Sequence, residues 1–252
     1  MKIVVIGGTG LIGSRVVAKL CAQGHDAVAA ALNTGVNVIT GEGLAQALSG
    51  ADTVVDVSNS PSFEDVAVLK FFETSTRNLL SAEAAEGVKH HVALSVVGTD
   101  RLAESGYMRA KIVQETLIKE STIPYSIVHA TQFFEFAKGI ADAGTEHGTV
   151  RVPKALIQPM AAEDVADAVA RVAAGPPLNR TIEVAGPEAM PMDEFIRHVL
   201  RARGDDRAVV GDDAARYFGA RLDERALLPG DAAVIGKTHL AEWLAAPQAV
   251  KG

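Results

Sequence analysis

The chain has 252 residues, of which 48% are hydrophobic and 22% charged, so it is long and apolar enough to bury the core of one large α/β domain. Its formal net charge of −7 argues against a partner held by phosphate contacts, and no run reaches the length of about 18 apolar residues that marks a membrane-spanning helix. We therefore expect a cytoplasmic protein that binds neither nucleic acid nor membrane, and the single cysteine, Cys21, rules out an internal disulfide.

Over the first 130 residues, short β-branched runs alternate with helical patterns. The predicted strands are Lys2–Ile6, Asp26–Ala31, Thr53–Val57, His91–Ser95 and Tyr125–Val128, with a short extra one at Val36–Val38. The predicted helices are Ile12–Ala22, Glu42–Leu48, Asp65–Glu86, Tyr107–Glu120 and Phe133–Ala143. This alternation is typical of α/β proteins and predicts a doubly wound parallel Rossmann sheet.

After about residue 145 the predicted elements become shorter. They are a strand fragment at Arg151–Pro153, a helix at Ala162–Ala174, a strand at Thr181–Val184 and a helix opened by Pro191. We expect residues 1–145 to form the Rossmann core and residues 146–252 a smaller α+β lobe packed on it, the two making a single structural unit.

A glycine-rich turn follows the first predicted strand directly and opens the first predicted helix. Glycine permits a tight turn, lets a pyrophosphate approach the main chain and lets helix and strand pack closely, while the helix N-terminus attracts negative charge. The motif in this position predicts a dinucleotide-binding site. We expect the cofactor to contact Gly7, Thr9, Gly10, Leu11, Ile12 and Gly13.

The end of the second predicted strand bears on the choice between NAD(H) and NADP(H). NAD-specific sites place an acidic residue there for the ribose 2′-hydroxyl, but no acid occurs between Asp26 and Glu42. No Lys or Arg is present in that segment to bind a 2′-phosphate either, and Arg15 fits a solvated helix residue. The neutral segment, with Asn33 expected at the ribose, slightly favours NADP(H) and leaves NAD(H) open.

Three residues suggest catalysis. Ser95 ends the fourth main predicted strand, and Tyr107 and Lys111 follow on a helix at a spacing that puts both on one face. A neighbouring ammonium lowers the pKa of a phenol toward the working range, and a serine at a strand end can bond the substrate oxygen. We expect hydride transfer to a carbonyl, with Ser95, Tyr107 and Lys111 as the catalytic residues.

These motifs resemble those of atypical short-chain dehydrogenases/reductases of the NmrA-like, NAD(P)H-binding type. The resemblance covers nearly the whole chain and is carried by the segments GGTGLIG, GADTVVDVSNS, HHVALSVVG, YMRAK, QPMAAEDVADAV and TIEVAGPEAM. It implies a small C-terminal substrate-binding lobe, the nicotinamide near Tyr107, Lys111 also on the nicotinamide ribose, and cofactor contacts from Ser58 and Asn59. The chain departs from many relatives by having His129-Ala130 in place of Arg-Pro, so its nicotinamide-side loop is expected to bind differently.

The substrate pocket is expected around the ends of the fourth and fifth predicted strands. The residues predicted to line it are Val97, His129, Gln132 and Phe133. No metal site is expected, because the adjacent His90 and His91 point to opposite faces of a strand and no further ligands follow at suitable spacing.

The sequence thus predicts an NAD(P)H-dependent oxidoreductase that transfers hydride to a carbonyl, quinone or similar small apolar substrate, with Tyr107 as general acid. The alternative is a non-catalytic, dinucleotide-sensing regulatory protein. A sugar-nucleotide epimerase is less favoured, because the C-terminal lobe is short and has few basic residues to hold a second diphosphate. The partner expected is a small-molecule substrate, and the chain is expected to be a monomer or homodimer.

Overall fold

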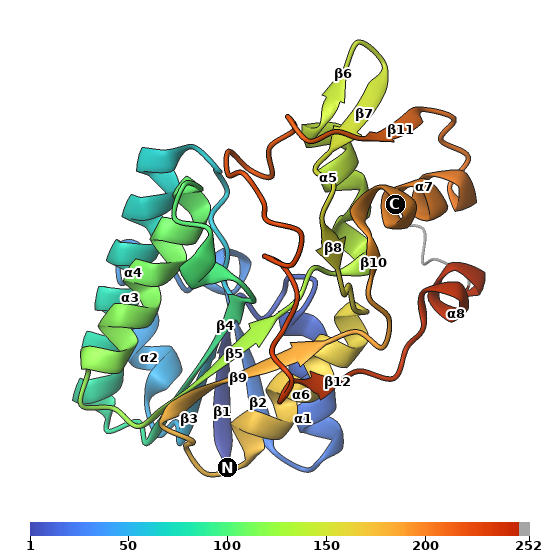
Figure 1. The fold of residues 1–252 in the computed structure, drawn as a ribbon. Helices are drawn as coiled ribbons and strands as arrows, with labels where there is room; N and C mark the ends of the chain where they lie inside the picture. Colours follow the sequence, from blue (N-terminus) through green and yellow to red (C-terminus); the bar gives the residue numbers. More distant parts are fainter. Residues whose placement is uncertain (247–252) are drawn as a thin grey trace.

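A seven-stranded parallel sheet forms the centre of the computed structural model, which describes residues 1–246 (Figure 1). Its strands are β1 Lys2–Ile6, β2 Asp26–Ala30, β3 Thr53–Asp56, β4 His90–Val96, β5 Tyr125–Ala130, β9 Arg180–Ala185 and β12 Val234–Ile235. They lie in the order β2-β1-β3-β4-β5-β9-β12, and every neighbouring pair is parallel. The predicted doubly wound Rossmann sheet is confirmed.

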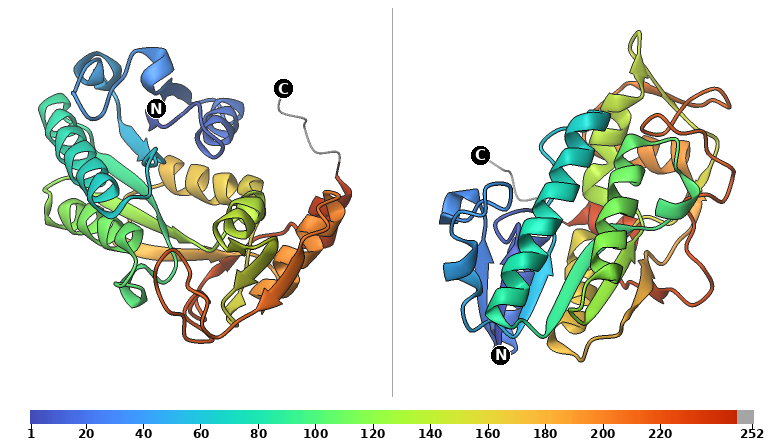
Figure 2. Two further views of the ribbon diagram at one scale, coloured as in Figure 1. Left: turned by 90° about the horizontal axis from the view of Figure 1, so that it is seen from above. Right: turned by 90° about the vertical axis from the view of Figure 1, so that its left-hand side faces the viewer.

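Helices cover both faces of this sheet (Figure 2). On one face lie α1 Gly13–Ala22 and α6 Ala162–Ala174; on the other lie α2 Leu44–Leu48, α3 Asp65–Glu86 and α4 Gly106–Glu120. Strand β1, which lies between β2 and β3, is apolar on both sides, as a parallel strand between two helical layers must be. Its residues Ile3 and Val5 pack toward α1 and α6, whereas Val4 and Ile6 pack toward α2 and α3.

A smaller lobe stands beyond the carboxyl ends of the strands. Its strands are β6 Thr145–Glu146, β7 Thr149–Val152, β8 Leu156–Ile157, β10 Met190–Pro191 and β11 Ala208–Gly211. Its helices are α5 Ala137–Ala143, α7 Met192–Ala202 and α8 Leu240–Ala245. The three remaining elements are the short 3₁₀ turns η1 Leu32–Thr34, η2 Thr99–Arg101 and η3 Phe134–Phe136. The segment predicted as one helix at Phe133–Ala143 therefore divides into η3 and α5.

The chain crosses between core and lobe more than once. After the first lobe strands it returns to the core as α6 and β9, enters the lobe again with α7 and β11, and comes back as β12. Residue 145 is therefore not a boundary of the central sheet, because β9 and β12 both come from later in the chain.

The short extra strand predicted at Val36–Val38 is wrong. Residues 36–38 lie in a loop closed by hydrogen bonds from the Asn37 N–H to the Glu42 carbonyl and from the Gly41 N–H to the Asn37 carbonyl. Val36 is buried beside α2, and β2 is the edge strand of the sheet. The β-branched run thus reflects burial of a loop rather than strand pairing.

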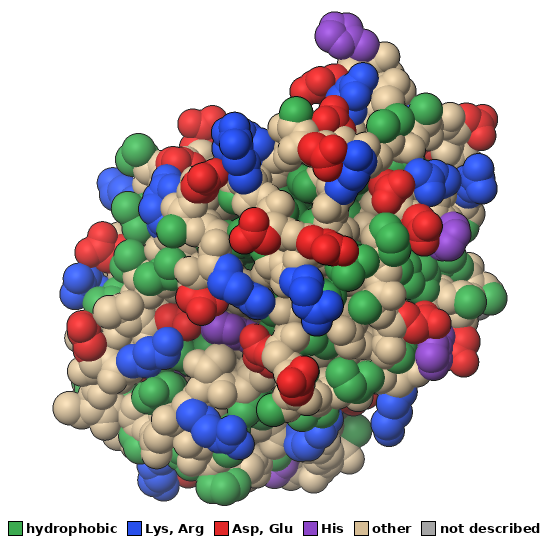
Figure 3. All heavy atoms as spheres, viewed as in Figure 1, with side chains coloured by type: hydrophobic (Ala, Val, Ile, Leu, Met, Phe, Trp, Pro, Cys, Tyr) green, Lys and Arg blue, Asp and Glu red, His purple; other side chains and the backbone are tan. Residues whose placement is uncertain are grey.

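Residues 212–233 run from β11 toward the upper ends of α3 and α4 before descending to β12 (Figure 1). On the face drawn in Figure 3, acidic and basic side chains are interspersed, with no continuous stripe of one sign. None of the helices within residues 1–246 combines the length and the apolar character needed to cross a bilayer.

Candidate functional site

The glycine turn lies between β1 and α1, and its glycines have different surroundings. A Cβ added at Gly13 would stand 2.2 Å from the Gly7 carbonyl oxygen, so Gly13 allows the helix to pack on the turn. At Gly10 the nearest neighbour would be the same oxygen at 3.3 Å, and Gly10 is exposed. Gly7 has a φ of +75°, which favours glycine. The glycines thus allow the tight turn and the close packing of α1, and Gly10 is the exposed one of the three.

Helix α1 begins at this turn without a side-chain cap from the described residues. The N-terminus of a helix carries a partial positive charge, which favours an anion at this end of α1. Of the other predicted cofactor contacts, Thr9 is exposed, Leu11 half-buried and Ile12 buried. The predicted contacts thus lie together at the turn and at the start of α1.

Asn33 meets the glycine turn from the end of β2, since the Thr9 hydroxyl donates to Asn33 Oδ1 at 3.1 Å. Neighbouring Leu32 is 75% exposed. Arg15 lies on the other side of α1, where it donates to the Leu11 carbonyl at 2.6 Å and pairs with Glu163 on α6 at 3.3 Å. The position at the end of β2 is therefore neutral and open, as the sequence predicts.

Tyr107 lies in the first turn of α4, close to the loop after β3. Its hydroxyl donates to Asn59 Oδ1 at 3.3 Å, so one of the residues expected to touch the cofactor is joined directly to the predicted acid. Ser58 is fixed in the same loop by Asp56, whose Oδ1 accepts bonds from the Ser58 N–H and hydroxyl. Burial among neighbouring rings raises the pKa of Tyr107 to about 12. The phenol is neutral at physiological pH.

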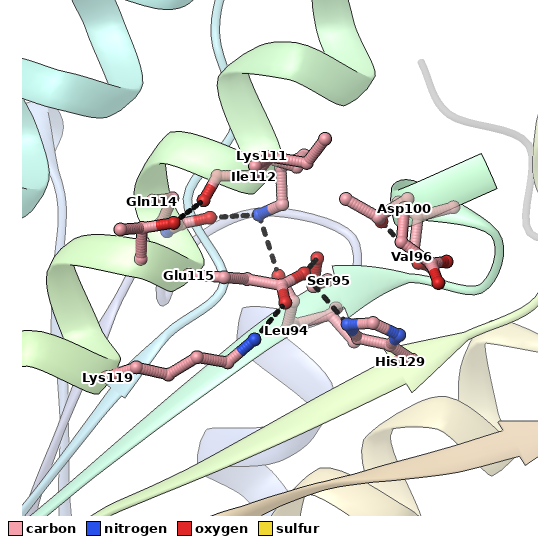
Figure 4. A network of polar contacts seen from close by, with 12 residues as sticks. Leu94, Ser95, Val96, Asp100, Lys111, Ile112, Gln114, Glu115, Lys119 and His129 are labelled. Carbon is pink, nitrogen blue, oxygen red and sulfur yellow. Dashed lines mark hydrogen bonds and ion pairs between the residues drawn. The ribbon is translucent and has the colours of Figure 1, made fainter. Parts of the chain in front are cut away.

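Ser95 is turned toward α4 (Figure 4). Its hydroxyl donates to Glu115 Oε1 at 2.7 Å, and His129 Nε2 lies 2.8 Å from the same oxygen. Lys119 binds the other carboxylate oxygen at 3.0 Å. Ser95 and His129 are register partners on β4 and β5, which explains why one carboxylate reaches both. Sequence reasoning missed Glu115, although its position one turn after Lys111 on the same helix was a usable signal.

The Lys111 side chain is almost fully buried, with 2% exposure. Its ammonium donates to the Leu94 carbonyl at 2.9 Å and to Gln114 Oε1 (Figure 4). It also lies 4.5 Å from the centre of the Phe72 ring. Gln114 in turn donates to Asp56 Oδ2 at 2.9 Å. Burial lowers the pKa of Lys111 to about 8, against the opposing charge of Asp56 and Glu115. Ser95, Tyr107 and Lys111 therefore have three separate sets of partners.

The four residues predicted to line the substrate pocket lie in different places. Val97 is fully buried, and His129 faces Glu115. Phe133 stacks on Phe136 at 5.1 Å and packs with the α1 and α6 layer. Gln132 is buried beside Tyr217 of the 212–233 segment, and burial raises the pKa of Tyr217 while the Gln132 side chain acts to lower it.

Two hollows lie in different parts of the molecule. One of about 230 Å³ is lined by Tyr107 together with residues of the β3–α3 loop and the 212–233 segment. A larger one of about 340 Å³ lies in the lobe, where Lys154 and Asp193 are already paired with Asp213 and Arg197. Within residues 1–246, no three His, Cys, Asp or Glu side chains gather as a metal site requires. The smaller cavity is the one at the candidate site.

Comparison with known proteins defines the class. A family model described as NAD(P)H-binding matches residues 7–176, and the chain belongs to this family. Among curated proteins, the Photosystem II assembly factor Ycf39 of Cyanophora paradoxa is 27% identical over 149 residues, covering 54% of this chain and 46% of the relative. The Ycf39 of Synechocystis is 24% identical over the same length and coverage. The match thus spans about half the length of these relatives.

Among solved structures, the UDP-glucose 4-epimerase of Thermotoga maritima has a TM-score of 0.73 and 17% identity, covering 97% of this chain and 96% of that one. A dTDP-glucose 4,6-dehydratase double mutant from Streptomyces venezuelae, with NAD bound, has a TM-score of 0.72 and 16% identity, covering 97% and 95%. These likenesses show a shared Rossmann fold.

Proposed function

We propose that the chain is an NAD(P)H-dependent oxidoreductase that reduces a carbonyl, quinone or similar small apolar compound, with Tyr107 as the proton donor. One observation carries the proposal. The Tyr107 hydroxyl is bonded to Asn59, in the loop that follows β3, and Tyr107 lines a cavity of about 230 Å³. A proton donor is thus available at the carboxyl edge of a dinucleotide-binding sheet, where Rossmann proteins bind their ligands.

The acid–base state of Tyr107 supports reduction. When bound, the reduced cofactor would supply hydride, two electrons and one hydrogen, for the carbonyl carbon. Tyr107 would give its hydroxyl proton to the carbonyl oxygen. Solvent then returns a proton to the phenolate. Because the pKa of Tyr107 is about 12, the hydroxyl is protonated before the step, and an alkoxide forming on the substrate is basic enough to take the proton.

NADP(H) is slightly favoured as the cofactor, with NAD(H) as the alternative. The support is the neutral Thr9–Asn33 pair at the end of β2, which offers no carboxylate to repel a 2′-phosphate. Contacts from Ser58 and Asn59 to the nicotinamide side are part of the same proposal.

A second candidate function, dinucleotide sensing without turnover, is favoured by the partners of Ser95 and Lys111. Ser95 is bonded to Glu115, and Lys111 to Leu94 and Gln114, so neither is free to act on a substrate without rearrangement. The direct catalytic roles predicted for these two residues stay predictions. A sensor would bind the dinucleotide at the same glycine turn and leave Tyr107 as a binding residue.

The test is oxidation of NADPH and NADH in the presence of a panel of ketones, aldehydes and quinones, combined with a direct binding measurement for each dinucleotide. Tyr107→Phe keeps the ring and removes the proton, so it should bind the dinucleotide like the parent and lose turnover by roughly 100-fold or more. Dinucleotide binding with no substrate-dependent turnover by the parent would reject the oxidoreductase and leave the sensor.

A further inference from the structure

A row of aromatic rings borders the 230 Å³ cavity. Phe72, Tyr107, Phe63, Phe218 and Tyr217 follow one another with centroid separations of 5.9, 5.6, 5.9 and 4.8 Å. Of these, Phe63, Tyr107 and Phe218 line the cavity itself. Phe63 and Phe218 are 56% and 41% exposed, although large apolar side chains in contact with one another are usually buried. The exposed rings thus offer an unfilled aromatic wall beside the proposed proton donor.

Phe218 occupies a backbone conformation that a phenylalanine rarely adopts. It lies with Gly219 at the tip of a two-residue turn closed by hydrogen bonds in both directions between Tyr217 and Ala220. The φ angles of Phe218 and Gly219 are +44° and +88°, both of the sign that a type I′ turn requires. Glycine or asparagine suits such a position better than a bulky side chain. Strain of this kind clusters at functional sites.

A second turn in the lobe provides a comparison. Between β6 and β7, His147 and Gly148 have φ angles of +48° and +80° and form the same kind of two-residue connection. That hairpin projects away from the body of the molecule (Figure 1). The two turns share a backbone geometry, but only the turn at Phe218 brings its strained side chain onto another ring.

Charged contacts hold the Phe218 turn over the start of α4. Arg216 pairs with Glu104 at 3.2 Å and also donates to the Gly219 carbonyl at 3.0 Å. Glu104 Oε2 accepts a further bond from the Arg221 N–H at 3.2 Å. The residues on either side of the turn are therefore tied to the loop that leads into Tyr107, which fixes Phe218 at the cavity.

The polar lining of the cavity suits an uncharged ligand. Among the described residues that line the cavity, only Asp65 is charged. It is paired with Arg109 at 2.6 Å and lies against the backbone of Gly106. Ser105 also lines the cavity, is 1% exposed, and its hydroxyl has no hydrogen-bond partner among residues 1–246. A buried hydroxyl without a partner is costly unless a ligand or water completes it. The ligand expected here carries an oxygen that can bond Ser105 or Tyr107.

We propose that this cavity binds a small, uncharged aromatic ring compound bearing a carbonyl or hydroxyl group, and that Phe218 with Phe63 selects for the ring. The inference rests on the proposed function where it says that the carbonyl of the ligand is reduced. Binding of the ring compound in the cavity does not depend on it. The cavity is smaller than the range of about 300 Å³ and above typical of larger ligands, so a single ring is the expected size. The 212–233 segment, through Phe218, thereby supplies the side of the cavity that would contact the ring of the ligand.

The first experiment measures binding without turnover. The probe is 4-fluorobenzyl alcohol in the presence of NADPH, a pair that cannot react because both compounds are reduced, followed by ¹⁹F NMR. Phe218→Gly removes the ring and relaxes the strained φ. The relief of strain offsets part of the lost ring contacts, so the variant should still fold and should bind the probe roughly tenfold more weakly, as loss of aromatic contacts predicts. His147→Gly makes the same backbone change in the distant turn and should bind like the parent. Ser105→Ala should weaken binding roughly threefold to tenfold.

The second experiment compares benzaldehyde with butanal as substrates. Phe218→Gly should lower kcat/KM for benzaldehyde by roughly tenfold and for butanal by less than about twofold, because only the first compound contacts the ring. Failure of the parent to bind 4-fluorobenzyl alcohol, or equal binding by Phe218→Gly and the parent, overturns the aromatic site even if butanal is reduced. Probe binding that depends on Phe218 in a protein without turnover supports the site and rejects only the oxidoreductase.

Discussion

Ser95 donates a hydrogen bond to Glu115 across 2.7 Å, so the serine near the end of β4 faces the helix that carries Tyr107 and is fixed there by a carboxylate. His129 and Lys119 bind the same carboxylate. Burial alone would raise the pKa of Glu115, but these bonds hold it at about 2. Glu115 is therefore a buried charge whose contribution to stability depends on pH.

Glu115→Gln should lower the free energy of unfolding by roughly 2–3 kcal/mol at pH 7, because a carboxyl whose folded pKa lies below its unfolded value stabilises the fold above the unfolded pKa. The contribution is complete above the ordinary value of 4.5 and is lost as the pH falls toward 2. Urea unfolding between pH 7 and pH 3 measures it. Glu73→Gln, which removes an exposed pair with Arg77, is the control and should cost less than about 0.5 kcal/mol. A parent–variant difference that stays constant over this range would contradict the prediction.

Lys111→Met should reveal a pH dependence of the same sign as that of Glu115, but in the alkaline range. The folded pKa of Lys111 is about 8 and its ordinary value 10.5, so below pH 8 both states carry the proton and the cost of burying the charge is complete. As the pH rises toward 10.5, the folded state gives up its proton first, and the parent should gain up to roughly 3 kcal/mol relative to the variant. Unfolding at pH 7.5 and pH 10 measures the change. Lys70→Met, on the exposed side of α3, should show no such gain.

Gly10→Ala and Gly13→Ala separate cofactor binding from folding. A methyl group at Gly10 would make one tight contact, with the Gly7 carbonyl oxygen at 3.3 Å, and would otherwise face the place expected for the pyrophosphate, so the variant should lose little stability and bind NADPH roughly tenfold or more weakly. A methyl group at Gly13 would collide with the Gly7 carbonyl, so that variant should lose several kcal/mol of stability, as overpacking predicts. Thermal unfolding and dinucleotide titration are the measurements. Unchanged NADPH affinity in Gly10→Ala would show that the cofactor does not bind at this turn.

Asn33→Asp tests the neutral position at the end of β2. A carboxylate there should repel a 2′-phosphate and accept from a ribose 2′-hydroxyl, so the ratio of NADPH to NADH affinity should fall by roughly tenfold or more. Asn37→Asp adds the same charge farther along the loop and should leave the ratio unchanged. If Asn33→Asp alters neither affinity, the ribose lies elsewhere and the preference for NADP(H) loses its basis.

Much of the core could be predicted because its signals are local. The helices Asp65–Glu86 and Ala162–Ala174 match the prediction residue for residue, since each has a long apolar stripe and ends at a glycine. The orientation of Ser95 had no such signal. Strand alternation says that Ser95 and Val96 face opposite sides, but which side faces the cleft depends on how α4 and the lobe pack. Val96, rather than Ser95, packs with the cluster that includes Tyr107.

The role of Phe218 was equally hidden. Nothing in the letters Tyr-Phe-Gly-Ala distinguishes a strained turn from an ordinary loop, and its contact with Phe63 joins positions 155 residues apart in the chain. Such contacts depend on the path of the whole 212–233 segment.

The return of β12 to the edge of β9 also has a kinetic consequence. The seventh strand is made only when synthesis reaches residue 235, so a growing chain must hold β9 as an unpaired edge while the lobe emerges. The 212–233 segment, which carries Phe218, is held at both ends only after β12 has paired with β9. During synthesis, the chain should therefore be able to bind a dinucleotide before the cavity beside Tyr107 can select for an aromatic ligand.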